Sequence, residues 1–395
     1  MEMPKNKIAC FLIMLIFVQS LVQPAFAAPA PAIELELNAG SAVLIDAENG
    51  TLLYEKDSRV PRPPASLTKL MTLLLVMEDL KSGLVDWDTM VTVSEQAWKT
   101  GGSQMFLNIG QQVSFRDLIK GITIVSANDA CVAVAEYLSG SEAAFVQRMN
   151  RRAAELGLEN SHFTNSHGMD APDHYMSALD VARLSAYLIR TQPEATAFQS
   201  EKEFTFNEIR QFNLNPLLGN FPGADGLKTG STPGAGYCLA ATSKQQGMRL
   251  ISVVMNTASE EERREDSIAL LNHGFRNFEM KTLYEENEVV AELPVKRSQK
   301  RAVGLVAEGP VQAVVPRNDS SYKIIEEFEL PDAVDAPVKE GDIIGTLRLK
   351  SPEGELIAEV DLAAQESLER LGFFPNLLRR AGDFFAGLWQ RIWPF

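Results

Sequence analysis

Apolar positions in the first two thirds of the chain change period several times, and each period predicts a different element. Alternating runs at residues 41–45 and 51–55 predict two strands around the turn Asp46-Ala47-Glu48-Asn49-Gly50. Leucine and methionine at helical spacing predict a helix over residues 66–80. Further helices are expected at residues 118–138, 142–156, 176–189 (capped by Ser177) and 261–274, and strands at 237–241 and 249–255. The mixture predicts an α/β (α+β) domain over residues 37–280.

The pattern changes after about residue 280. Short alternating runs, separated by Gly, Pro and Asp, predict strands at residues 289–295, 301–306, 311–315, 322–330, 343–349 and 355–362. These strands predict a separate, β-rich C-terminal domain over residues 281–368.

The two ends of the chain have patterns of their own. Lys5 and Lys7, the apolar run 8–18 and the small-x-small site at residues 25–27 predict a secretory signal peptide over residues 1–27. A Pro/Ala linker over residues 28–36 follows. Residues 370–395 predict an amphipathic helix whose Phe- and Trp-rich face lies in a membrane interface. The alternatives are an uncleaved N-terminal anchor and a terminal helix that docks on its own domain or in a dimer.

Composition narrows the class of protein. The 395 residues carry a net charge of −15 and are 45% hydrophobic, which is ordinary for a globular chain. Such an acidic chain does not bind nucleic acid through its bulk charge, and no basic stripe is seen. Removal of the signal peptide leaves two cysteines, Cys131 and Cys238, and buried unpaired thiols are favoured over a disulfide.

The first candidate for chemistry is Ser66-Leu67-Thr68-Lys69. Residues three apart share a face at the start of a helix, so Lys69 can take the proton of Ser66 if burial lowers the lysine pKa. The same spacing at Ser320–Lys323 falls in the β-rich region, where residues three apart point to opposite faces. A plain N-cap serine and a solvated lysine are the alternative for Ser66 and Lys69.

Two further polar elements follow in the chain. Ser126-Ala127-Asn128 precedes a helical run and can present a hydroxyl and an amide to a cleft, although a helix-cap cluster would look the same. Lys228-Thr229-Gly230 lies among glycines and offers a positive charge, a hydroxyl and a strand edge that a substrate can approach closely, although a Gly-rich hairpin strand would also fit.

Together the three elements, in this order and spacing, resemble the penicillin-recognising serine acyltransferases. The stretches 64–72, 126–131, 166–172 and 225–230 sharpen the resemblance to low-molecular-mass D-alanyl-D-alanine carboxypeptidases. The resemblance covers residues 37 to about 275 by motif, and the β-rich domain and tail by layout. It implies a serine β-lactamase/penicillin-binding-protein-like transpeptidase fold, with helices on both sides of a sheet and an all-helical subdomain near residues 90–170.

The resemblance also implies roles for residues. Ser66 would attack the carbonyl between the two terminal D-alanines of a peptidoglycan stem peptide, Lys69 would take its proton, and Ser126 would relay a proton to the leaving D-alanine. Asn128 would hold the substrate backbone. The terminal carboxylate would be bound by Lys228, Thr229 and Arg263, with the adjacent Arg264 as a less favoured candidate. Gly230 would admit the substrate, and the backbone N–H groups of Ser66 and Ser231 would form the oxyanion hole. The resemblance implies no cofactor and no metal, inhibition by β-lactams, and a site of action at the outer face of the cytoplasmic membrane.

Other functions share parts of this pattern. A D,D-endopeptidase on the same fold is not separated from a carboxypeptidase by sequence, and a β-lactamase would need a deacylating Glu motif that is not found. A zinc peptidase could use His167, Asp170, Asp173 and His174, but the chain has no His-Glu-x-x-His. A Ser-His-Asp hydrolase would need a Gly-x-Ser-x-Gly elbow, which is absent. An inactive, membrane-tethered cell-wall binding protein is the non-enzyme alternative.

Overall fold

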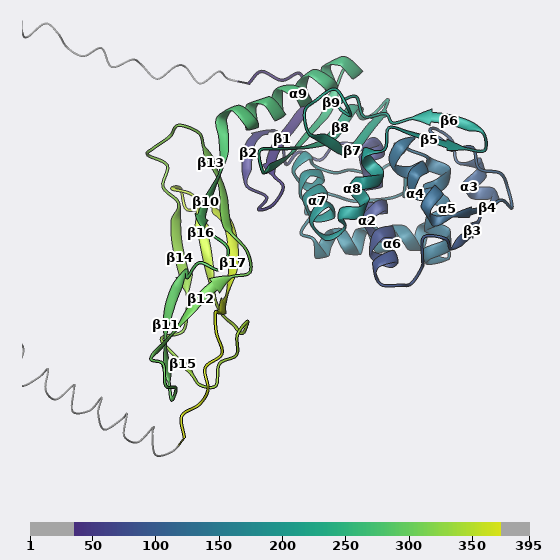
Figure 1. The fold of residues 1–395 in the computed structure, drawn as a ribbon. Coiled ribbons are helices and arrows are strands. Elements are labelled where there is room, and N and C mark those ends of the chain that lie inside the picture. Colours follow the sequence, from purple (N-terminus) through teal and green to yellow (C-terminus); the bar gives the residue numbers. More distant parts are fainter. Residues whose placement is uncertain (1–34, 373–395) are drawn as a thin grey trace, which may run out of the picture. The chain divides into compact units, whose positions relative to one another are not determined.

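The computed structural model describes residues 35–372 (Figure 1). The predicted signal peptide (1–27), nearly all of the linker (28–36) and nearly all of the tail helix (370–395) lie outside these residues. Buried apolar side chains form two clusters, one drawn from residues 43–255 and the other from residues 293–368. Within residues 35–372, no helix is both long enough and apolar enough to cross a membrane.

A five-stranded antiparallel sheet organises the first part. Its strands are β1 (Ser41–Asp46), β2 (Leu52–Lys56), β7 (Ala224–Thr232), β8 (Gly236–Gln245) and β9 (Met248–Thr257), in the order β2-β1-β9-β8-β7. Every residue of β1 is buried, because α9 (Glu260–Asn277) covers one face of the sheet and α7 (Ala178–Thr191) covers the other (Figure 1). The predicted sheet with helices on both sides is confirmed, and β7 is left at the edge.

The remaining helices pack beside this sheet, with α2 (Lys69–Lys81) at their centre. A 3₁₀ turn η1 (Ala65–Thr68) leads into α2, which is buried on nearly all sides. Helix α2 packs against α4 (Phe115–Ile124), α5 (Asn128–Ser139), α6 (Glu142–Glu155) and α7, while α3 (Glu95–Lys99) packs on α5 and α8 (Pro193–Ser200) packs on α4, α7 and β7. Ser177 caps α7 as predicted, accepting a hydrogen bond of 3.1 Å from Asp180 N.

Two expectations for the helical region are wrong. The helix predicted over residues 118–138 is two helices, α4 and α5, because Ser126 adopts a φ of 62° and breaks the chain direction between them. The apolar period continues across this break, since both helices face the same core. The subdomain near residues 90–170 is also not all-helical, because β3 (Met90–Thr92) pairs with β4 (Gln112–Ser114). A second hairpin, β5 (Glu203–Phe206) and β6 (Ile209–Phe212), follows α8.

The β-rich part forms two sheets. Its six-stranded sheet has the order β14-β16-β17-β12-β11-β15, and β10 pairs with β13 in a separate ladder. The strands are β10 (Phe278–Tyr284), β11 (Ala291–Lys296), β12 (Ala302–Ala307), β13 (Val311–Pro316), β14 (Ile325–Glu329), β15 (Val334–Asp335), β16 (Ile343–Lys350) and β17 (Leu356–Ala364). All six strands expected from the sequence are present, and β10 and β15 are additional.

Candidate active site

Ser66 and Lys69 meet where η1 passes into α2. Residues three apart are stacked in a 3₁₀ turn, and the Lys69 amine lies 2.8 Å from Ser66 Oγ. Ser66 makes no side-chain cap of the helix, and Lys69 is only 1% exposed. The alternative of a capping serine and a solvated lysine is therefore wrong.

Burial and hydrogen bonding act on the protonation of Lys69 in opposite directions. Its Nζ lies 2.7 Å from Asn128 Oδ1 and 2.6 Å from the carbonyl oxygen of His167, two groups that can only accept hydrogen bonds. Burial lowers the pKa of Lys69 to about 8. A neutral amine has two N–H bonds for these two carbonyls and directs its lone pair at the Ser66 hydroxyl. The arrangement can therefore take the serine proton.

Ser126 and Asn128 lie in the break between α4 and α5. The Asn128 side chain is held at both ends, because its Oδ1 accepts from Lys69 and its Nδ2 donates to Gly101 O at 2.7 Å. Ser126 is 2% exposed and has the positive φ that separates the two helices. The predicted second element is thus brought to the same lysine as the first, through Asn128.

The third element lies on the edge strand β7 and faces η1, the turn that carries Ser66. A methyl group added at Gly230 would lie 2.9 Å from the backbone nitrogen of Ser66, so only glycine permits this approach of strand and turn. Lys228 and Thr229 are buried, whereas Ser231 is exposed. Ser231 pairs with Tyr237 across the ladder, and both line an open groove of about 680 Å³.

Three basic side chains, those of Lys69, Lys228 and Arg263, lie near this edge. Burial, and then the charges of Lys69 and Arg263, lower the pKa of Lys228 well below its ordinary value. Arg263 is 5% exposed on α9, with its guanidinium 5.8 Å from the Tyr237 ring and its Nε unpaired among residues 35–372. The adjacent Arg264 is instead only half-buried and pairs with Glu261. Since no carboxylate in the described part of the chain forms an ion pair with Lys228 or Arg263, an anionic ligand would be attracted to these two side chains.

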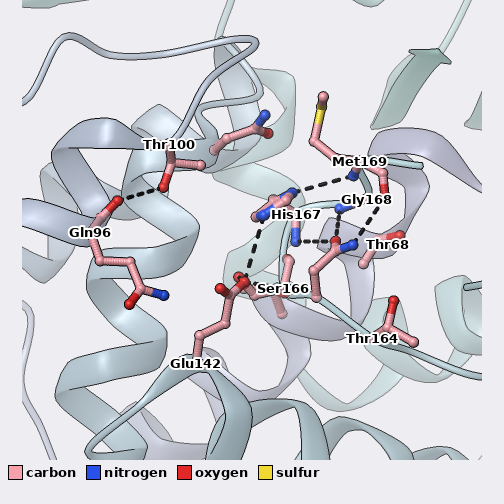
Figure 2. Close-up of polar contacts among 12 residues, drawn as sticks. Thr68, Gln96, Thr100, Glu142, Thr164, Ser166, His167, Gly168 and Met169 are labelled. Atoms are coloured by element: carbon pink, nitrogen blue, oxygen red, sulfur yellow. Dashed lines mark hydrogen bonds and ion pairs between the residues drawn. The ribbon is translucent and has the colours of Figure 1, made fainter. Parts of the chain in front are cut away.

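The loop over residues 161–176 contributes contacts that sequence reasoning missed. His167 provides the carbonyl oxygen for Lys69, and its ring is turned toward Glu142, at 3.6 Å, as Figure 2 shows. Gly168, with a φ of 94°, packs so closely on η1 that a methyl group there would lie 1.9 Å from Ala65 O. The sequence pointed to residues 166–172 only through the resemblance and through the zinc alternative, and no sequence signal identified a backbone carbonyl as a partner.

Two polar side chains of the same loop, Asp170 and His174, connect it to the end of β7 and to η1. Asp170 accepts hydrogen bonds from Thr232 Oγ1 at 2.7 Å and from Gly234 N at 2.9 Å, which ties the loop to the end of β7. His174 Nδ1 accepts from Thr164 N at 3.0 Å, so its Nε2 carries the proton and faces Thr68 Oγ1 at 2.8 Å. Thr68 in turn donates to Ala65 O, the carbonyl that precedes Ser66.

The residues considered as zinc ligands serve these separate contacts. Among residues 35–372, no group of three or more His, Cys, Asp and Glu side chains is placed to hold a metal ion. Cys131 and Cys238 are buried as free thiols, as predicted. Burial raises the pKa of Cys131 to about 12 and that of Cys238 to about 11, so both remain protonated near neutral pH.

Comparisons with known proteins agree with this geometry. Residues 25–259 match the family described as D-alanyl-D-alanine carboxypeptidase, and residues 278–370 match the penicillin-binding protein 5 C-terminal domain. The chain is 40% identical to D-alanyl-D-alanine carboxypeptidase DacC of Escherichia coli, over 89% of each protein. It is 38% identical to DacF of Bacillus subtilis, over 89% of this chain and 91% of the relative.

Solved structures resemble both parts of the chain. Penicillin-binding protein 5 from Haemophilus influenzae has a TM-score of 0.74 at 37% identity, covering 87% of this chain and 99% of that one. Penicillin-binding protein D2 from Listeria monocytogenes, in its ampicillin-bound form, has a TM-score of 0.57 at 33% identity and covers 61% of this chain and 99% of that one. The predicted fold, with its C-terminal β-rich domain, is confirmed.

Proposed function

Since this chain belongs to the family of D-alanyl-D-alanine carboxypeptidases, which are serine hydrolases, we propose that Ser66 is the nucleophile with which it removes the terminal D-alanine of peptidoglycan stem peptides. The observation that carries this assignment is the buried amine of Lys69, which lies 2.8 Å from Ser66 Oγ and has two carbonyl oxygens as its other partners. A serine hydroxyl needs such an acceptor to become a nucleophile.

In acylation, Ser66 Oγ bonds to the carbonyl carbon between the two D-alanines while its proton passes to Lys69. The oxyanion that forms is held by the backbone N–H groups of Ser66 and Ser231, and the close packing of Gly230 on Ser66 N supports this placement. The C–N bond then breaks, and Ser126 relays a proton to the departing D-alanine nitrogen. Water cleaves the resulting ester, which releases the shortened peptide and restores the Ser66 hydroxyl.

Substrate binding uses the same edge of the sheet. The substrate carboxylate is bound by Lys228, Thr229 and Arg263, and the two buried basic side chains without carboxylate partners, Lys228 and Arg263, support this role. Asn128 holds the peptide backbone with the Nδ2 hydrogen that its bond to Gly101 leaves available. β-Lactams acylate Ser66 because their strained amide takes the place of the D-Ala-D-Ala bond, and they persist because the leaving amine stays tethered.

The ends of the chain determine where the enzyme acts. Residues 1–27 direct export and are then removed, and residues 371–395 hold the enzyme on the outer face of the cytoplasmic membrane as an interfacial helix. The apolar, aromatic face of that segment in the sequence supports this proposal.

The test is the intact mass of residues 28–395 over time after mixing with penicillin, with Ser66→Ala as control, followed by an assay of D-alanine release. We expect an adduct that persists for many minutes and depends on Ser66. Rapid loss of the adduct would indicate a β-lactamase, and D-alanine release by Ser66→Ala would overturn the assignment of the nucleophile. For the carboxylate site, Arg263→Gln should raise KM for a stem pentapeptide, whereas Arg264→Gln should leave it unchanged.

A further inference from the structure

We propose that the turn between β11 and β12 is a second contact with anionic membrane lipid, placed beside the point where the tail leaves the β-rich domain. We call residues 296–301 the exit turn. The proposal rests on the interfacial tail helix of the proposed function, and it adds a charged surface with a stated partner. The sequence did not point to this segment, because its four basic residues are few in an acidic chain and too short a run to count as a basic stripe.

The exit turn is bonded to the last described residues. Leu371 N donates to Arg297 O at 2.7 Å, and Ser298 forms a β-bridge with Arg370. Ser298 is 2% exposed, so the turn and the departing chain pack directly on each other. Figure 1 shows the last coloured residues leaving the β-rich sheet at the end where β11 and β15 lie. The exit turn therefore lies directly beside the start of the tail.

The length of the connection limits the distance between the turn and the membrane. The apolar face of the tail begins in the sequence at Phe374, three residues after Leu371. Three extended residues span at most about 11 Å, and the Debye length at physiological ionic strength is about 8 Å. If Phe374 lies at the level of the lipid headgroups, the long side chains of the exit turn reach within one Debye length of them.

The charge of the exit turn matches an anionic surface. Four of its six residues are exposed Lys or Arg, namely Lys296, Arg297, Lys300 and Arg301. The bridge to Ser298 places a fifth exposed basic residue, Arg370, beside them. The acidic neighbours form exposed ion pairs, Arg297 with Asp335 and Lys300 with Glu366. Exposed pairs contribute little free energy, so lipid phosphates can replace these carboxylates.

The negative net charge of the whole chain makes this positive patch important for orientation at a membrane. A protein of charge −15 is repelled by an anionic bilayer, and a positive patch at the tail exit makes one orientation favourable. The exit turn would therefore stabilise the attachment and hold the β-rich domain with its β11–β12 end toward the lipid. A soluble polyanion of the cell wall is a different partner, and its binding is an outcome that the test separates.

The experiment compares the mature chain, residues 28–395, with two charge-matched double variants. Lys296→Gln/Lys300→Gln removes two charges from the exit turn and breaks the ion pair of Lys300 with Glu366. The control, Lys99→Gln/Lys202→Gln, removes two exposed charges elsewhere and breaks the comparable ion pair of Lys99 with Glu95. Both variants should be acylated by penicillin at the rate of the unmodified enzyme, which verifies the fold.

Binding is measured by co-sedimentation with vesicles of phosphatidylcholine alone and with about one third phosphatidylglycerol, at low and high salt. We expect equal binding of all three proteins to the neutral vesicles. On anionic vesicles at low salt, each positive charge near the surface contributes about fivefold in affinity, so the exit-turn variant should bind about 25-fold more weakly than the control. High salt should remove that difference.

The outcomes separate this proposal from the tail anchor. Binding to neutral vesicles combined with equal affinities of the two variants for anionic vesicles would overturn the exit-turn contact and leave the anchor standing. Failure of the unmodified chain to bind either vesicle would overturn both. Loss of anionic-vesicle binding in the exit-turn variant alone would support the contact even if neutral vesicles bind poorly. A chain truncated at residue 372 lacks the tail and tests the other partner. If this chain binds soluble teichoic-acid-like polyphosphate as tightly as it binds anionic vesicles, the exit turn is a polyanion site rather than a membrane contact.

Discussion

Replacement of Gly168 by alanine tests how the loop over residues 161–176 supports the nucleophile. A Cβ at this position would lie 1.9 Å from Ala65 O, 2.5 Å from the carbonyl carbon of Ala65 and 2.9 Å from Thr68 Oγ1. Ordinary C···O contacts are at about 3.3 Å, so the loop and the turn before Ser66 must separate by about 1.4 Å. The obstacle is backbone, and no side-chain rotation relieves it.

The structure gives the size of the expected effect. A displacement of about 1 Å in a catalytic group costs about 10²-fold in rate. The same movement shifts His167 O, which adjoins Gly168 and accepts from Lys69 at 2.6 Å. The φ of 94° adds backbone strain for any residue with a Cβ, so we expect a loss of about 2–4 kcal/mol of unfolding free energy with about 100-fold slower acylation.

The assay is the second-order rate of Ser66 acylation by a fluorescent penicillin, with urea unfolding of the same samples. Gly157→Ala is the matched control, because Gly157 also has a positive φ, of 66°, but no atom lies within 4 Å of its added Cβ. The control should lose about 1 kcal/mol of stability from backbone strain and keep its acylation rate. If Gly168→Ala is acylated within about threefold of Gly157→Ala, the loop does not position the nucleophile.

Three further predictions concern protonation and positioning. Because burial lowers the pKa of Lys69 to about 8, the base form is the minor one below that pH, and acylation should slow about tenfold from pH 7 to pH 6 and level off above pH 9. A flat stopped-flow profile from pH 6 to 8 would contradict a base that titrates near 8. Asp170→Asn keeps an acceptor for Thr232 but loses the carboxylate oxygen that accepts from Gly234 N. Acylation should therefore fall about tenfold while the far-UV circular dichroism stays unchanged. An unchanged acylation rate would show that the hydrogen bonds of Asp170 to the end of β7 are not needed. Burial raises the pKa of Asp46 to about 6, so the folded state binds this proton more tightly than the unfolded chain, and stability is lost as the pH rises from 4 to 6 and stays lost above it. Asp46→Asn should therefore be more stable than the unmodified chain by about 2 kcal/mol at pH 7 and by almost nothing at pH 4 in urea titrations; equal stabilities at both pH values would contradict the buried charge.

The sequence alone predicted most of the elements, because their apolar periods are strong. The hairpin at residues 41–55, the Ser177 cap and the six strands of the β-rich part all appear where they were expected. Local signals of this kind depend on neighbours three or four positions away, which a linear pattern contains. The split of residues 118–138 into two helices was missed, since a single residue with positive φ leaves the apolar period intact.

Motif order was sufficient to identify the family and to select the three elements that the fold brings together. Spacing along a helix allowed Ser66 and Lys69 to meet, because residues three apart share a face. Their order along the chain says nothing about distance in space, yet Asn128 and His167 are hydrogen-bonded to the same lysine from 59 and 98 residues away.

Only the tertiary structure decided what surrounds these residues. The lowered pKa of Lys69 comes from burial among several elements, and desolvation is a property of packing rather than of sequence position. The choice between Arg263 and Arg264 depended on which side of α9 faces Tyr237. The contact of Gly168 with Ala65 involves backbone atoms alone, and residue identity does not encode backbone partners. The sequence determined which groups are candidates for the chemistry, and folding determined their protonation, their partners and the surface that the exit turn presents beside the tail.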